Sequence, residues 1–201
     1  GTTYQVQRAT FDKVLADAAE RAGAELRYRH EVIAVDVEGE RPQVTVRSPE
    51  GEEYRVEAEF LLDASGFGRI LPRLLKLESP SNFPARGAIF THVRDGVAPG
   101  GDFDRNKILI SVHPDHQDVW YWTIPFSNGY CSLGVVAEQA YLAQYEGDEM
   151  QRLRAIVGEE PGLAELLANA EWNLPARQIV GYSSNVSTLW GRNYALLGNA
   201  G

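Results

Sequence analysis

Two strand-like runs of this chain end in nearly the same glycine-rich turn. Residues 61–66 read LLDASG, and residues 196–201 read LLGNAG. In open α/β sheets, ligands bind beyond the carboxyl ends of parallel strands, where small residues let backbone amides approach a phosphate and a polar side chain can reach a ribose hydroxyl. Either ending alone could simply be a tight exit from a strand. Together they favour a dinucleotide site in an α/β fold.

The first half of the chain predicts one helix followed by strands. Apolar residues recur at helical spacing from Phe11, with Thr10 as the expected N-cap and Gly23 as the residue that ends the helix. Three segments then read as strands: residues 24–39, 42–59 and 59–66. The middle segment alternates like a half-exposed hairpin, whereas residues 60–62 form the continuous apolar run of a parallel strand covered on both faces. We therefore expect two sheets in this part.

The second half predicts an antiparallel sheet with short helices. After the proline-containing linker 78–86, four segments read as strands joined by turns: residues 87–96, 106–114, 118–126 and 130–138. Residues 148–158 and 161–170 read as helices, the second with Pro161 in its first turn. Residues 178–187 are strand-like and lead back to the second glycine-rich ending.

Composition narrows the classes of partner. The 201 residues carry a formal charge of −9, and this excess of acid repels phosphate backbones and anionic lipid, so we expect no nucleic-acid partner. No apolar run is long enough to predict a membrane span or a signal peptide. The single cysteine, Cys131, cannot form an internal disulfide, so a reducing cytoplasm is the expected location. The first residue is Gly and the last turn would open a helix, so we expect an internal piece of a longer protein.

The most aromatic segment, residues 119–126, reads VWYWTIPF. In a strand, Trp120 and Trp122 point to one face and Tyr121 to the other, and Pro125 ends the ladder because it has no N–H. Two neighbouring indoles form a wall that suits a flat aromatic ligand. The alternative is the core of a sandwich, since strands are enriched in tryptophan and tyrosine in any case.

Residues 120–125, WYWTIP, match in full the WxWxIP signature of flavin-dependent halogenases of the tryptophan type. The order of the surrounding segments resembles the same family and, more broadly, the superfamily of FAD-dependent hydroxylases and geranylgeranyl reductases. Residues 4–37 resemble the segment that reaches the FAD phosphates and adenine, residues 63–69 the internal fingerprint, and residues 195–201 the second FAD motif. In that last motif the usual acidic residue on the FAD ribose is Asn199 here. The cofactor-binding residues that the resemblance implies are Arg8, Val32, Asp63, Ser65, Gly66, Arg69, Gly198 and Asn199.

The resemblance also implies a reaction. Reduced FAD from a separate flavin reductase, O2 and chloride or bromide would generate hypohalous acid, which a lysine holds and an electron-rich aromatic substrate consumes. That substrate would be a free small molecule or one tethered to a carrier protein. The predicted catalytic residues are Trp120, Trp122 and Pro125; as a hypothesis, the two indoles exclude water and keep substrate off the flavin. The family's reactive lysine and first GxGxxG would precede Gly1. Three lysines occur here, Lys13, Lys76 and Lys107, and none has a setting that predicts a reactive amine.

The predicted fold class is α/β (α+β): a partial FAD-binding Rossmann-like domain with an antiparallel substrate domain. We expect residues 1–78 in the FAD-binding part, 79–180 in the substrate domain and 181–201 in the return to the FAD-binding part. A hydroxylase or prenyl-chain reductase of the superfamily is the first alternative, and a non-catalytic protein that binds an apolar ligand is the second. His113 and His116 flank a turn without a second ligand pair, so we expect a solvated turn and no metal site.

Overall fold

The computed structural model describes residues 4–98 and 103–201, and the chain divides into two compact units. The sheet unit combines the described residues up to Leu15 with Pro84–Gly181, and the strand-end unit combines Ala16–Phe83 with Tyr182–Gly201. The division predicted from sequence, at residues 78 and 180, stays a prediction.

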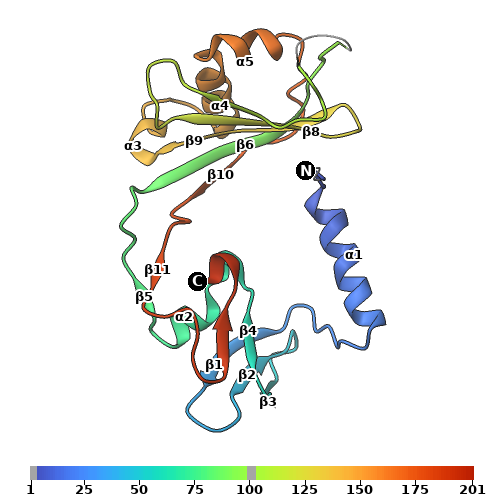
Figure 1. Cartoon of the computed structure of the whole chain (residues 1–201), viewed down its shortest axis with the longest axis vertical. Helices are drawn as coiled ribbons and strands as arrows, with labels where there is room; N and C mark the ends of the chain where they lie inside the picture. The colour runs from blue at the N-terminus through green and yellow to red at the C-terminus, as the bar shows by residue number, and fades with distance from the viewer. Residues whose placement is uncertain (1–3, 99–102) are drawn as a thin grey trace. The chain divides into compact units, whose positions relative to one another are not determined.

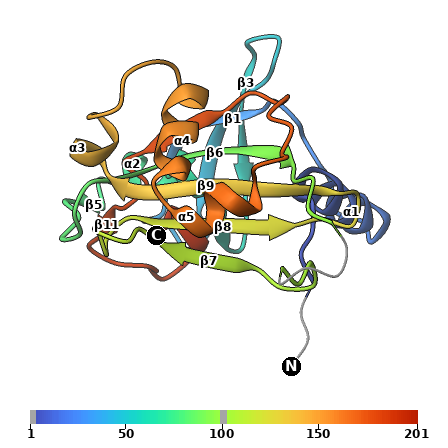
Figure 2. The same ribbon diagram turned by 90° about the horizontal axis from the view of Figure 1, so that it is seen from above.

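The sheet unit is built on one antiparallel sheet. Its strands are β6 (Arg86–Arg94), β7 (Leu109–Val112), β8 (Trp120–Pro125), β9 (Tyr130–Glu138) and β10 (Arg177–Val180). Their order is β10-β6-β9-β8-β7 and every pair is antiparallel, and Figure 2 shows β6, β9, β8 and β7 side by side. The four predicted strands are confirmed, and part of the strand-like run 178–187 joins the same sheet as β10.

Helices cover one face of this sheet. They are α3 (Gln139–Leu142), α4 (Glu149–Gly158) and α5 (Pro161–Leu166), and Figure 1 shows α4 and α5 on one side of the strands. The predicted helices at 148–158 and 161–170 are confirmed, although the second ends earlier. The core between helices and sheet includes the fully buried side chains Ile89, Tyr121, Leu133, Val135, Leu153, Ile156 and Leu163. The period-2 and helical patterns thus meet along a single apolar layer.

Helix α1 (Arg8–Arg21) begins before the predicted cap. Thr10 lies inside the helix rather than at its N-cap, so that prediction was wrong, while Gly23 follows the helix with φ +100° as expected for a residue that ends one. No residue of α1 is buried, and Phe11 and Val14 are 43% and 55% exposed. These two apolar side chains are therefore largely exposed in the part of the chain that the structure describes.

The strand-end unit contains the predicted hairpin. Strands β1 (Glu31–Asp36), β2 (Gln43–Arg47) and β3 (Glu53–Glu57) form an antiparallel sheet in that order. The strand expected over 24–39 is shorter, because residues 24–30 form a loop and turn in which Arg29 has φ +60°. The hairpin itself is confirmed.

The two glycine-rich endings lie in the same unit. Strands β4 (Leu61–Asp63) and β12 (Tyr194–Leu196) pair in parallel, and the short helices η1 (Gly66–Gly68), α2 (Ile70–Leu74) and η2 (Gly198–Ala200) follow them. Strands β5 (Glu78–Ser79) and β11 (Asn185–Val186) form a second small pair. The parallel strand is confirmed, but its coverage on both faces is not, since Phe60 and Leu62 are 46% and 65% exposed.

In the part of the chain that the structure describes, no helix is both long enough and apolar enough to cross a membrane.

Candidate functional site

The two glycine-rich endings lie next to each other at one edge of the parallel strands. Leu61 pairs with Tyr194 and Asp63 with Leu196, and the N–H of Leu197 donates to the carbonyl of Asp63 over 2.8 Å. The turns η1 and η2 that follow contact each other. Residues more than 130 positions apart in the sequence thus form one surface beyond the carboxyl ends of β4 and β12.

Two glycines leave this surface open to a ligand. Gly66 has φ +58° and Gly198 has φ +55°, conformations that favour glycine, and a Cβ at either position would meet no atom within 4 Å. Asn199 is exposed, and its side chain makes no hydrogen bond to another described residue. The accessible backbone at the paired strand ends fits a phosphate of a dinucleotide. The side-chain amide of Asn199 beside it fits a ribose hydroxyl.

Asp63 and Ser65 shape the turn that contains Gly66. The buried carboxylate of Asp63 accepts from the N–H of Ser65 at 2.8 Å and from the N–H of Leu71 at 2.7 Å. The hydroxyl of Ser65 accepts from the N–H of Ile70 at 3.0 Å. Together the two side chains satisfy amides of the first turn of α2, which fixes the path of the backbone around Gly66. Their direct contact with a cofactor stays a prediction.

Arg69 is held inside the strand-end unit. Its side chain is only 8% exposed, and Nε donates to Glu78 at 2.9 Å. A second nitrogen donates to the carbonyl of Asn185 at 3.4 Å. This guanidinium ties β5 and β11 to the turn after β4. Its predicted role toward the cofactor is untested, and the contacts seen here are structural.

Of the other predicted cofactor residues, Arg8 belongs to the sheet unit and Val32 to the strand-end unit. Arg8 is exposed at the start of α1 and pairs with Asp12 over 2.9 Å, and the hydrogen bond and charge of Asp12 raise the pKa of Arg8. Val32 is half-buried in β1, opposite Val46. The structure brings Asp63, Ser65, Gly66, Gly198 and Asn199 together at the strand ends. Contact of these residues with a cofactor, like that of Arg8 and Val32, stays a prediction.

The tryptophans of β8 form an aromatic surface on the sheet face opposite the helices. We call Phe90, Trp120 and Trp122 the aromatic wall: the two indole centroids lie 6.1 Å apart, and the Phe90 ring lies 6.1 Å from Trp122. Tyr121 points the other way into the helix-covered core, where its hydroxyl donates to the carbonyl of Ile156 at 3.1 Å. The predicted division of faces is confirmed. Desolvation by burial raises the pKa of Tyr121.

Pro125 ends the ladder of β8 on one side only. Pairing with β7 stops at Thr123, opposite Leu109, whereas pairing with β9 continues to Pro125, opposite Cys131. The next N–H, that of Phe126, donates to Tyr130 across the β8–β9 hairpin at 2.8 Å. The missing N–H of Pro125 therefore faces the edge where β7 has already ended, where no partner needs it.

Comparison with known proteins connects these features. The FAD binding domain family matches residues 2–191 of this chain. The chain belongs to the FAD binding domain family. At its strand-end turns, Gly66 and Gly198 have open space around them and Asn199 is exposed.

The relatives of this FAD-binding chain include halogenases. It is 30% identical to the tetracycline 7-halogenase of Kitasatospora aureofaciens, over 94% of this chain and 37% of that protein. It is 26% identical to a 1H-pyrrole-2-carbonyl peptidyl-carrier-protein chlorinase of Pseudomonas fluorescens, over 98% of this chain and 44% of the relative. A solved flavoprotein/dehydrogenase of Cytophaga hutchinsonii superimposes with a TM-score of 0.88 at 39% identity, over 98% of this chain and 48% of that one. The chain spans less than half the length of each of these relatives.

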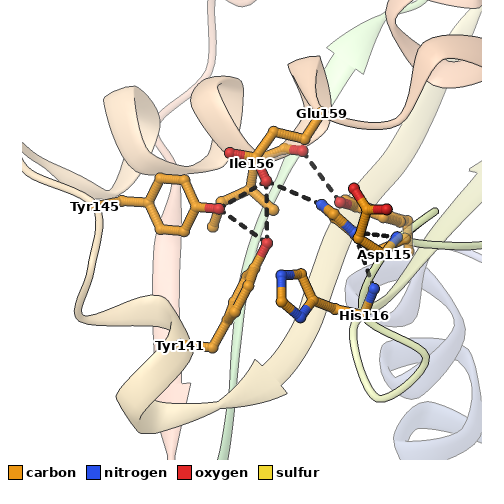
Figure 3. A network of polar contacts seen from close by, with 8 residues as sticks. Asp115, His116, Tyr141, Tyr145, Ile156 and Glu159 are labelled. Atoms are coloured by element: carbon orange, nitrogen blue, oxygen red, sulfur yellow. Dashed lines mark hydrogen bonds and ion pairs between the residues drawn. The ribbon is translucent and has the colours of Figure 1, made fainter.

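A second polar cluster of the FAD-binding chain lies away from the wall, on the helix side of the sheet unit. Figure 3 shows Glu159 accepting from the hydroxyls of Tyr145 and Tyr141, at 2.7 and 3.0 Å. The imidazole of His113 accepts two backbone N–H bonds at Nδ1, so the proton is on Nε2, which donates to Glu159 at 2.9 Å. We call these four side chains the Glu159 cluster.

The expectation of a solvated turn at residues 113–116 was only half right. The turn exists, but His113 is 5% exposed because it anchors the turn to Glu159, which lies 46 positions away in sequence. Nothing local signals such a partner. Within residues 4–98 and 103–201, no group of three or more His, Cys, Asp or Glu side chains could hold a metal ion.

Proposed function

We propose that this chain is part of an FAD-dependent halogenase of the tryptophan type. The parent enzyme would use reduced FAD, O2 and chloride or bromide to halogenate an electron-rich aromatic substrate. The observation that carries the proposal is the aromatic wall, formed by a strand with the complete WxWxIP signature on the sheet face opposite the helices. The halogenase relatives support it, and the FAD family membership supplies the cofactor.

The strand-end surface is the proposed flavin contact of this chain. The backbone at Gly66 and Gly198 would approach phosphate oxygens, because neither position carries a Cβ in the way. The amide of Asn199 would hydrogen-bond a ribose hydroxyl, a role that an acidic residue fills in the family. Asp63, Ser65, Arg69, Arg8 and Val32 stay in the proposed set; for the first three, the contribution visible here is to hold the turn. When bound, reduced FAD would supply the activation of O2.

The aromatic wall would act on substrate and water. Trp120 and Trp122 present a large apolar surface that excludes water from a reactive halogenating species and keeps an aromatic substrate at a fixed distance from the flavin. Pro125 would leave the end of β8 without a backbone donor on the side of β7, beyond the last β7–β8 pair at Thr123.

The proposed partners follow the relatives. One relative is named for halogenation of tetracycline, and another for a pyrrole carbonyl carried on a peptidyl carrier protein. We propose an aromatic substrate that is either free or carrier-bound, and a separate flavin reductase as the source of reduced FAD. A cytoplasmic location would suit a reductase-dependent enzyme whose single cysteine is buried and free.

The test needs no knowledge of the natural substrate. The full-length parent would be incubated with FAD, a flavin reductase, NADH, O2 and bromide, and oxidation of a generic hypohalite trap would be followed. We expect trap oxidation that requires both enzyme and bromide and that survives catalase, which removes free hydrogen peroxide. Flavin reoxidation without halide dependence would contradict the proposal and point to a hydroxylase or reductase of the same superfamily.

A further inference from the structure

A glycine lies in the middle of the aromatic wall. In the register of the sheet, Phe90 on β6 is opposite Gly134 on β9, and Gly134 is opposite Trp122 on β8. The three residues thus form one row on the same sheet face, with neighbouring strands about 4.8 Å apart. A side chain at the central position would separate the two aromatic rings of the row.

The indole of Trp122 lies directly over that glycine. A Cβ built on Gly134 would come within 2.2 Å of Cζ2 and 2.4 Å of Cη2 of Trp122. Real side chains do not approach so closely, and both nearest atoms belong to the ring rather than to the backbone. Any residue larger than glycine at position 134 must therefore tilt the indole away from the sheet. Glycine usually weakens a strand interior, so its presence here has a packing reason.

The polar edge of the same indole is already occupied. Nε1 of Trp122 donates to the hydroxyl of Ser132 at 3.0 Å, and Ser132 lies on the same strand and the same face as Gly134. This hydrogen bond fixes the rotation of the ring. It also removes the only hydrogen-bond donor of the side chain from the surface, since indole has a single N–H. At Trp122 the aromatic wall therefore offers a ligand the π face of the indole and no N–H donor.

We propose that Gly134 and Ser132 are positioning residues that hold the Trp122 indole against the sheet, so that the wall recognises a planar aromatic ring by stacking and not by an indole hydrogen bond. This inference rests on the proposed function, because it assigns the wall to the substrate. The ligand that we expect is a flat aromatic ring system, and the substituents on its edge can be polar or apolar. A saturated ring of the same size would lose the face-to-face and edge contacts that aromatic pairs gain.

The first test observes the indole itself. The full-length parent would be labelled with 15N-tryptophan, and the Trp122 indole signal assigned by Trp122→Phe. In Ser132→Ala we expect that signal to move more than the other indole signals, and its N–H to exchange with solvent roughly fivefold faster, as loss of one hydrogen bond implies. Ser127→Ala, at an exposed serine in the β8–β9 turn, is the matched control and should leave the signal unchanged. An unchanged Trp122 signal in Ser132→Ala would overturn the role of Ser132.

The second test measures shape selection. Binding of 2-naphthol and of trans-2-decalol to the parent would be compared by equilibrium dialysis, because the two probes have similar size but only the first is planar. We expect the wild type to prefer the naphthol by roughly fivefold or more, on the scale of an aromatic pair. In Gly134→Ala the preference should fall to about one, mainly through weaker naphthol binding. Gly158→Ala, where a Cβ meets no atom within 4 Å, is the control substitution.

The outcomes separate this inference from the proposed function. Both readouts are independent of halide and turnover, so a parent that oxidises no halide can still confirm or reject the wall geometry. If Gly134→Ala keeps the melting temperature of the wild type and also keeps its preference for the planar probe, the inference is wrong. If Gly134→Ala unfolds, Ser132→Ala decides, since it removes only a hydroxyl.

Discussion

At the scale of single residues, buried polar groups carry the largest consequences. The carboxylate of Asp63 is buried and both of its oxygens accept backbone N–H bonds, from Ser65 and Leu71. Asp63→Asn replaces one acceptor by an NH2 group that would face an N–H. We expect a loss of about 1–3 kcal/mol in the free energy of unfolding, measured in urea. Asp36→Asn, at an exposed side chain, should cost less than about 0.5 kcal/mol; equal losses would contradict this assignment.

The Glu159 cluster predicts a pH dependence. Burial raises the pKa of Glu159. The hydrogen bonds from Tyr145, His113 and Tyr141 together lower it by more than burial raises it, so the net pKa is below the ordinary value of 4.5. A carboxylate with a depressed pKa stabilises the fold above its unfolded pKa, and this contribution is lost as the pH falls through the folded value. Glu159 is 41% exposed, so solvent screening keeps the effect small.

We therefore compare wild type with Glu159→Gln in urea unfolding from pH 7 to pH 3. The wild type should be more stable at pH 7, and the difference should shrink below about pH 4.5, where Glu159 begins to take up a proton in the unfolded chain. Glu146→Gln, at an exposed glutamate before α4, is the control for a general change in charge. A difference that stays constant across the whole range would show that the hydrogen bonds do not depend on the charge of Glu159.

At the scale of elements, α4 is capped by Asp148, the residue before it, together with Gln151 in its first turn. Asp148 accepts from the N–H of Gln151, and the side chain of Gln151 accepts from the N–H of Asp148, a capping box. The helix supplies the Leu153 and Ile156 side chains, which pack in the core against the sheet face opposite the aromatic wall. Asp148→Ala should lower the free energy of unfolding by about 1 kcal/mol. Glu149→Ala, one position further and outside the box, should cost clearly less; the reverse order would show that helix-dipole effects outweigh the cap.

For several helices and strands, the periodicity of the sequence was sufficient to predict the element. Alternation in 42–59 and in the four strands from 87 to 138 predicted real strands, and the helical spacing predicted α4. The predicted start of α1 was wrong, because the helix begins at Arg8 and Thr10 lies within its first turn. The run 178–187 split into β10 and β11 at a left-handed Gly181, in two different units. A local pattern does not indicate which sheet a short strand will join.

At the scale of the whole molecule, the question is whether this chain alone holds FAD. The chain spans less than half of its relatives, and the strand-end unit offers two parallel strands with Phe60 and Leu62 exposed beside them. We therefore predict weak or no FAD retention by residues 1–201 after gel filtration, with the full-length parent as positive control. Stoichiometric FAD in the protein peak would contradict this prediction and place the main phosphate contacts at Gly66 and Gly198.

The sequence by itself determined the local elements, the two-faced aromatic strand and the resemblance that led to FAD, because these depend on periods of two and 3.6 residues and on one contiguous motif. Tertiary structure alone decided that the two glycine-rich endings are neighbours, that His113 meets Glu159, and that Gly134 lies beneath Trp122. Those contacts join residues far apart in the chain or on neighbouring strands, so they depend on strand order and register. A register shift of one residue in β8, for example, would turn Trp122 to the other face of its sheet, away from Gly134.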